Sequence, residues 1–170
     1  MDAVTIPIAP LGNLPVREEK EVSDQMVLPR ISYIYNFCSD LKAIRQFYSE
    51  CIGLPEGLYK PEYGCISYKM PGMEFMFWQT DDVPARPSGF AAQPGGGGGE
   101  LPVTSWTVAV PEKEFAAAVS RLRKMGYESK AEQPVWLQDC YWAFVVRDPA
   151  GNTVELSTVP STRPESTVWM

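Results

Sequence analysis

Glu155 is the residue whose setting most suggests chemistry, because it is a carboxylate among apolar neighbours in the stretch "DPAGNTVELST", residues 148–158. The stretch is typical of a tight turn followed by a strand. A buried carboxylate is costly unless it is hydrogen-bonded, paired with a cation or bound to a metal. Metal sites that use glutamate commonly use histidine as well, and this chain contains no histidine.

The four cysteines, Cys38, Cys51, Cys65 and Cys140, are scattered and include no C-x-x-C pair. This spacing is neither that of a zinc ribbon nor that of a disulfide framework. We expect four reduced, mostly buried thiols in a cytoplasmic protein. A catalytic cysteine normally relies on a nearby histidine, so the absence of histidine disfavours thiol catalysis.

The composition is that of a globular protein, with 170 residues, 45% hydrophobic and 21% charged. That length suits one ordinary domain or two small modules that share a core. No apolar run is long enough to cross a bilayer, so we expect no membrane partner. The net charge of −6 disfavours nucleic-acid binding, which needs a basic face, and suits a neutral or cationic small molecule.

A Pro- and Gly-rich stretch with five consecutive glycines divides the chain, because such a run belongs to neither a helix nor a packed strand. We interpret it as a flexible linker or a long surface loop. The predicted organisation is an N-terminal arm at 1–28, a first module at 29–82, the linker at 83–101, a second module at 102–159 and a tail at 160–170.

The two modules follow the same plan of one strand, one helix and three strands. The first helix is predicted to begin near Ser39 as its N-cap and to stop at Gly53, and the second to run from Pro111 to Gly126. The second module's strands are expected around "VTSWTVAV", "YESKAEQ", "CYWAFVVRD" and "NTVELST". Neither module could cover its own sheet, so we expect the two to pack together.

These features resemble the vicinal oxygen chelate superfamily, which covers glyoxalase I, extradiol dioxygenases and bleomycin-resistance proteins. The stretch "ISYIYNFCSDLKAIRQFYSECIGL" is similar to that family's opening strand, Asp turn and helix, and "DPAGNTVEL" is similar to its closing motif. The resemblance implies an α+β fold in which two βαβββ modules form an incompletely closed, eight-stranded, barrel-like sheet with helices outside and a cavity within.

The resemblance also implies four metal-ligand positions, which fall on Tyr33, Met76, Ser105 and Glu155. Only Glu155 is a suitable ligand for a hard divalent ion. We therefore predict no metal site and no cofactor. If a metal is bound after all, Glu155 and Glu74 are the candidate ligands.

Strand alternation predicts instead an aromatic cup with one or two carboxylates at its floor. Such a cup suits a partly aromatic ligand with a donor or a positive charge. Equally, the aromatic side chains could fill a collapsed interior, and Glu155 could be hydrogen-bonded to a neighbour such as the Tyr33 hydroxyl. The candidate ligand-binding residues are Tyr33, Tyr35, Phe37, Glu74, Met76, Trp78, Ser105, Thr107, Glu155, Trp136 and Trp142.

Two functions from different classes follow from this pattern. The first is a metal-free protein that binds a neutral or cationic, partly aromatic small molecule. The second is a lyase, isomerase or dioxygenase in which Glu155 is the catalytic base or the ligand of an unconventional metal site. A purely structural module with a filled interior is a third reading. The long linker is compatible with a monomer and with a homodimer, including one that exchanges modules.

Overall fold

The computed structural model describes residues 31–83, 85, 88–93 and 97–169. The predicted arm at 1–28 lies outside these residues. Among the described residues, no helix is both long enough and apolar enough to cross a membrane.

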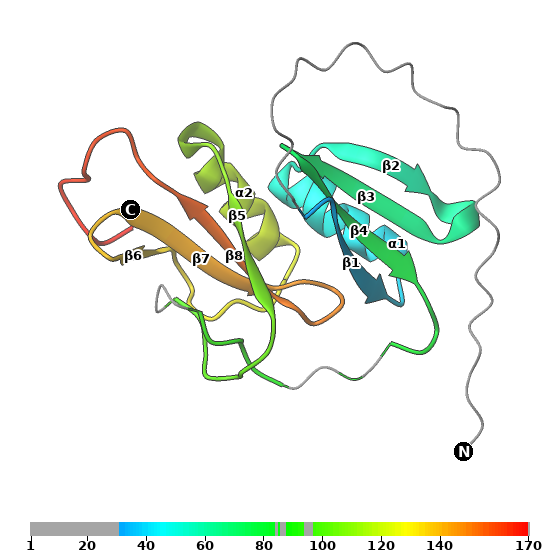
Figure 1. Cartoon of the computed structure of the whole chain (residues 1–170). Coiled ribbons are helices and arrows are strands. Elements are labelled where there is room, and N and C mark those ends of the chain that lie inside the picture. The colour runs from blue at the N-terminus through cyan, green and yellow to red at the C-terminus, as the bar shows by residue number, and fades with distance from the viewer. Residues whose placement is uncertain (1–30, 84, 86–87, 94–96, 170) are drawn as a thin grey trace, which may run out of the picture. The chain divides into compact units, whose positions relative to one another are not determined.

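The first module forms a four-stranded mixed sheet in the order β1-β4-β3-β2 (Figure 1). In this sheet β1 runs parallel to β4, and the other neighbouring pairs are antiparallel. The elements are β1 (Tyr33–Cys38), α1 (Leu41–Arg45), η1 (Gln46–Ile52), β2 (Glu56–Lys60), η2 (Pro61–Tyr63), β3 (Cys65–Met70) and β4 (Met73–Gln79).

The first helix begins one residue later than expected, because Asp40 rather than Ser39 is its N-cap. The Asp40 carboxylate accepts hydrogen bonds from the backbone N–H groups of Lys42 (2.8 Å) and Ala43 (3.0 Å). These two bonds satisfy donors that the first turn of a helix leaves without intrahelical partners. The helix widens into the π-helical turns of η1 and ends at Gly53, as predicted, with a left-handed φ of 90°.

The second module repeats the plan as a sheet in the order β5-β8-β7-β6 (Figure 1). Its elements are β5 (Ser105–Ala109), α2 (Glu112–Lys124), β6 (Val135–Leu137), β7 (Tyr141–Arg147) and β8 (Thr153–Thr158). Pro111 is the N-cap of α2, and Gly126 follows the helix with a φ of 76°. The α+β class and the two βαβββ modules are thus confirmed, and the described strands form two separate sheets and no closed barrel.

The prediction for one strand of the second module is wrong. The segment "YESKAEQ" contributes only an isolated bridge between Ser129 and Val146, and β6 lies further along at Val135–Leu137. The charged and small residues of the predicted segment have little to bury. The apolar triplet that follows Pro134 packs on β7 instead.

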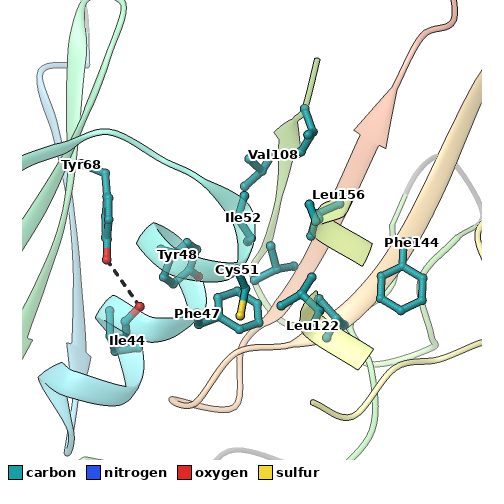
Figure 2. Packing of buried hydrophobic residues seen from close by; sticks show 14 of the residues in the cluster. Ile44, Phe47, Tyr48, Cys51, Ile52, Tyr68, Val108, Leu122, Phe144 and Leu156 are labelled. Atoms are coloured by element: carbon teal, nitrogen blue, oxygen red, sulfur yellow. Dashed lines mark hydrogen bonds between the residues drawn. The ribbon is translucent and has the colours of Figure 1, made fainter. Parts of the chain in front are cut away.

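The core lies between the two modules and draws on both. Figure 2 shows Phe47, Cys51 and Ile52 of η1 opposite side chains of the second module. The second module's labelled side chains there are Val108, Leu122, Phe144 and Leu156. Each sheet turns one row of every strand toward this core: Phe75 and Phe77 in β4, and Trp106 and Val108 in β5. The alternate rows therefore face away from it.

A buried polar network joins the modules at the centre of this core. The Tyr48 hydroxyl donates to Asp148 Oδ2 (2.9 Å) and accepts from Trp106 Nε1 (3.1 Å). Asp148 also accepts from the backbone and side-chain N–H groups of Asn152. Burial raises the pKa of Asp148, and these hydrogen bonds oppose the rise. Asp148 thus shapes the turn before β8, as its turn motif predicts, and also links the two modules.

The C-terminal tail packs back on the second module through Trp169. Its ring meets Trp142 and Phe115 edge to face, with centroids 4.9 Å and 5.5 Å away. An isolated bridge between Val168 and Val135 extends the edge of the sheet at β6. The tail thereby covers apolar surface that α2 and β7 leave open.

We expect Tyr48→Phe to lower the free energy of unfolding by about 1–3 kcal/mol, because it leaves both Trp106 Nε1 and Asp148 Oδ2 short of a buried partner. Tyr68→Phe is the matched control. Tyr68 is also fully buried, but the contacts of its hydroxyl with described residues are long, to the Ile44 carbonyl (3.4 Å) and Ser49 Oγ (3.5 Å). Urea denaturation followed by tryptophan fluorescence measures both variants. Equal losses would contradict the role given to the Tyr48 network.

Candidate functional site

Glu155 lies in the middle of β8 and is 4% exposed. Its Oε1 accepts a hydrogen bond from Thr107 Oγ1 (3.3 Å), since the parallel ladder sets Thr107 beside Glu155. The Tyr33 hydroxyl, the partner considered from the sequence, belongs to the other sheet, and Tyr33 is 49% exposed. Thr107 therefore takes the place that Tyr33 was expected to fill.

The remaining surroundings of Glu155 are mostly apolar. Val145 opposes it in the antiparallel ladder with β7. Gly97 approaches so closely that a Cβ at that position would stand 2.9 Å from Glu155 Oε2 and from Leu137 Cδ1. Desolvation raises the pKa of Glu155, and the hydrogen bond from Thr107 opposes this rise. A carboxylate in such a place can pair with a cation or take up a proton.

A cavity of about 160 Å³ lies next to this carboxylate, on the same face of the second sheet. Gly97, which lies against Glu155, also lines the cavity. The other lining residues are Lys130, Ala131, Gln133, Val135, Leu137, Ala143 and Val145. The sequence reasoning missed these residues. Alternation along β7 from the Val145–Glu155 pair would have found Ala143 and Val145, whereas no local signal marks Gly97 or Lys130.

The first sheet carries the predicted aromatic row on the face turned away from the core. Tyr33, Tyr35 and Phe37 stand beside Glu74, Met76 and Trp78 in the parallel ladder of β1 and β4. Tyr35 and Phe37 are 56% and 51% exposed, and the Tyr33 and Tyr35 rings stack with centroids 5.8 Å apart. An exposed aromatic row of this kind is a candidate ligand or partner surface.

The expectation of one cup lined by both modules of the same chain is corrected by this arrangement. In β4, the members of the aromatic row alternate with Phe75 and Phe77, and these two phenylalanines face the shared core. In β8, Glu155 alternates with Val154 and Leu156, which also face the core. Each candidate face is thus the reverse side of its own core-facing sheet. Within one chain the aromatic row and Glu155 form two surfaces.

The second module's other candidates divide between its two faces. Ser105, Thr107 and Glu155 share a face, as alternation predicts. The prediction for Trp142 is wrong, because its side chain is 6% exposed in the core cluster. Trp136 packs edge to face on Trp142, with centroids 5.2 Å apart, and its Nε1 donates to Asp139 Oδ1. Neither tryptophan therefore belongs to the Glu155 face.

The donors around Glu155 do not fit a divalent metal ion. In the described part of the chain, its polar neighbours are the neutral hydroxyl of Thr107 and, through space, the phenol of Tyr141, and the other groups close to it are apolar. Mg²⁺, Mn²⁺ or Zn²⁺ needs several oxygen or nitrogen ligands. Glu74, the other carboxylate considered from the sequence, stands on the first sheet. Within the described part of the chain, no three His, Cys, Asp or Glu side chains gather in a group that could hold a metal.

Comparison with known proteins places the chain in a family. The model described as "Glyoxalase/Bleomycin resistance protein/Dioxygenase superfamily" matches residues 30–156, so the chain belongs to this superfamily. The resemblance drawn from the opening and closing motifs is thereby confirmed. No curated protein matches the chain.

Solved structures of the same superfamily share the fold at low sequence identity. A glyoxalase/dioxygenase from Nostoc punctiforme is 15% identical, with a TM-score of 0.60 over 82% of this chain and 100% of that one. A glyoxalase-related enzyme from Fulvimarina pelagi is 22% identical, with a TM-score of 0.56 over 84% and 99%. The fosfomycin resistance protein FosX from Listeria monocytogenes is 16% identical, with a TM-score of 0.56 over 79% and 97%.

We expect Glu155→Gln to stabilise the protein at neutral pH and to raise Tm by about 2–4 °C. This shift corresponds to a gain of about 1 kcal/mol in the free energy of unfolding for a chain of this size. The folded protein holds the Glu155 proton more tightly than the unfolded chain, so wild-type stability falls as pH rises from near the ordinary value of 4.5 through the raised folded pKa. The glutamine in the variant does not ionise, so the variant does not lose stability in this pH range.

Thermal unfolding at several pH values, with the exposed Glu132→Gln as control, measures the difference. The advantage of Glu155→Gln should disappear below about pH 4, where the unfolded chain is also protonated at this position. A variant that is less stable than wild type at pH 7 would contradict the account of Glu155 as a desolvated carboxylate.

Proposed function

We propose that the protein is a metal-free small-molecule-binding member of the superfamily, holding a neutral or cationic, partly aromatic ligand. The observation that carries this proposal is Glu155, a desolvated carboxylate to which one side chain among the described residues, Thr107, donates a hydrogen bond. Burying such a group costs stability, and a ligand's amine or hydroxyl would offset that cost. The superfamily's own description includes resistance proteins beside enzymes.

The ligand's aromatic part would be held by the row on the first sheet. Tyr33, Tyr35, Phe37 and Trp78 offer flat, half-exposed rings that favour stacking and cation–π contact. Ser105 and Thr107, beside Glu155, would supply further hydrogen bonds from the second sheet. Trp136 and Trp142 drop out of the proposed site, because they pack in and against the core.

A homodimer would bring these two surfaces together. In one chain the aromatic row and the Glu155 face are both turned away from the shared core, so neither completes the other. In a symmetric pair, the row of one protomer can stand against the Glu155 face of its partner, and the contact repeats by symmetry. Of the six residues in the aromatic row only Glu74 is charged, so most of the chain's net charge of −6 lies outside the proposed contact.

An enzymatic function is the second candidate, and the raised pKa of Glu155 favours it. A carboxylate made more basic by desolvation is suited to remove a proton from a bound substrate, as a lyase or isomerase requires. The binding function and the enzymatic one share the same residue. Elemental analysis of protein purified without chelator separates both from the metal-dependent dioxygenase reading: stoichiometric Mn, Fe, Ni or Zn that disappears in Glu155→Gln would overturn the metal-free proposal.

We expect a screen of cationic aromatic compounds, from benzylamine to bleomycin-like antibiotics, to yield ligands whose affinity depends on Glu155. Glu155→Gln should lower the affinity for a cationic ligand by about tenfold or more, because one charge-assisted contact is lost. Glu132→Gln should leave this affinity unchanged. Because only the ionised carboxylate attracts a cation, affinity should fall as pH drops through the raised pKa of Glu155.

Isothermal titration calorimetry at pH 5 and pH 8 measures both effects, and product analysis by mass spectrometry shows whether any ligand is turned over. If no compound in a broad panel of cationic and aromatic molecules binds, ligand binding is not the protein's role. Turnover that is lost in Glu155→Gln would favour the enzymatic candidate.

A further inference from the structure

The segment between the modules is folded onto the second sheet, over the face that carries Glu155. We call its described parts, residues 88–93 and 97–101, the strap. Ala91 is fully buried, and its backbone N–H donates to Thr153 Oγ1 (2.8 Å) on β8. The Lys130 ammonium donates to the Gly98 carbonyl from the other side. The sequence suggested a flexible linker or a surface loop, and the described parts pack as a loop with specific contacts.

The two limbs of the strap are held together by backbone hydrogen bonds. Gly99 N–H donates to the Ala91 carbonyl (2.7 Å), and Ala92 N–H donates to the Leu101 carbonyl (2.8 Å). Only glycine permits this approach, because a Cβ at Gly98 would collide with the Ala91 carbonyl oxygen and one at Gly99 with that of Phe90. The glycine run is therefore used for close packing as well as for length.

Gly97 stands in the space directly against the carboxylate. A methyl group at this position would press on three side chains, because a Cβ would stand 2.9 Å from Glu155 Oε2 and Leu137 Cδ1 and 3.4 Å from Val145 Cγ2. The cavity left beside it, about 160 Å³, is small for a drug-sized ligand, whose pocket usually exceeds ~300 Å³. Moving Gly97 outward would join this cavity to the Glu155 carboxylate.

We propose that the strap is a displaceable cover: it fills the Glu155 face in the free protein, and a ligand must lift it to reach the carboxylate. This inference rests on the proposed ligand-binding function. Two side-chain hydrogen bonds tie the described parts of the strap to the second module, one from Thr153 on β8 and one from the exposed Lys130, so opening should be accessible at equilibrium. Ligand affinity is then reduced by the fraction of molecules that are closed.

Two variants should loosen the strap by different routes. Lys130→Ala removes the tether to the Gly98 carbonyl, and Gly98→Ala drives a Cβ against the Ala91 carbonyl oxygen. Lys113→Ala, an exposed residue on α2, is the matched control. The full chain is labelled with a water-soluble carbodiimide and glycine ethyl ester, and peptide mass spectrometry reports modification at Glu155. Asp148, buried in the core, serves as the internal measure of global unfolding.

We expect labelling of Glu155 to rise about fivefold or more in both loosened variants, and affinity for benzylamine to rise by a similar factor, as expected when a closed population is opened. Asp148 should stay unlabelled. Unchanged labelling of Glu155, with faster hydrogen exchange at the Gly99 and Leu101 amides, would overturn the covering role. So would increased labelling with unaltered benzylamine affinity. Increased labelling with no benzylamine binding in any variant, wild type included, would retain the cover and reject the ligand-binding function.

Discussion

The structure depends on a buried hydrogen-bonded carboxylate, Asp148, which the Tyr48 hydroxyl reaches from the other module. Because this bond is enclosed in the shared core, the two modules must keep the relative orientation that satisfies it. The same orientation fixes which side chains of every central strand face the core. It thereby leaves the aromatic row of the first sheet and the Glu155 face of the second on surfaces turned away from that core.

Glu155 and Asp148 are both buried acids close together in sequence, yet they differ in how well they are satisfied. Asp148 accepts hydrogen bonds from Tyr48 and from the backbone and side chain of Asn152. In the part of the chain that the structure describes, Glu155 has only the Thr107 hydroxyl as a side-chain donor. A fully satisfied carboxylate is explained by the architecture. A poorly satisfied one, held under a glycine strap, is better explained by a ligand that supplies the missing contacts.

Much of the fold could be predicted from the sequence, because the turn glycines and the alternating strands act locally. The repeated module plan, the stop at Gly53 and the shared face of Ser105, Thr107 and Glu155 follow from such local rules, whereas the partner of Glu155 does not. The face of Trp142 did not, since β7, "YWAFVVR", is apolar on both sides and alternation alone gives no direction. The Tyr48–Asp148 bond joins residues 100 positions apart, and the strap's packing depends on backbone contacts that no side-chain pattern records.

The most direct test of this account asks whether the two outward faces meet across a dimer. In a Cys140→Ser background, which removes the exposed thiol, one preparation carries Tyr35→Cys on the aromatic row and another carries Ala109→Cys on the Glu155 face. The two are mixed and treated with a short bismaleimide. The account predicts a covalent heterodimer that joins Cys introduced at 35 to Cys introduced at 109 between chains. A protein that stays monomeric, or a mixture that yields no link between positions 35 and 109 of different chains, would contradict it.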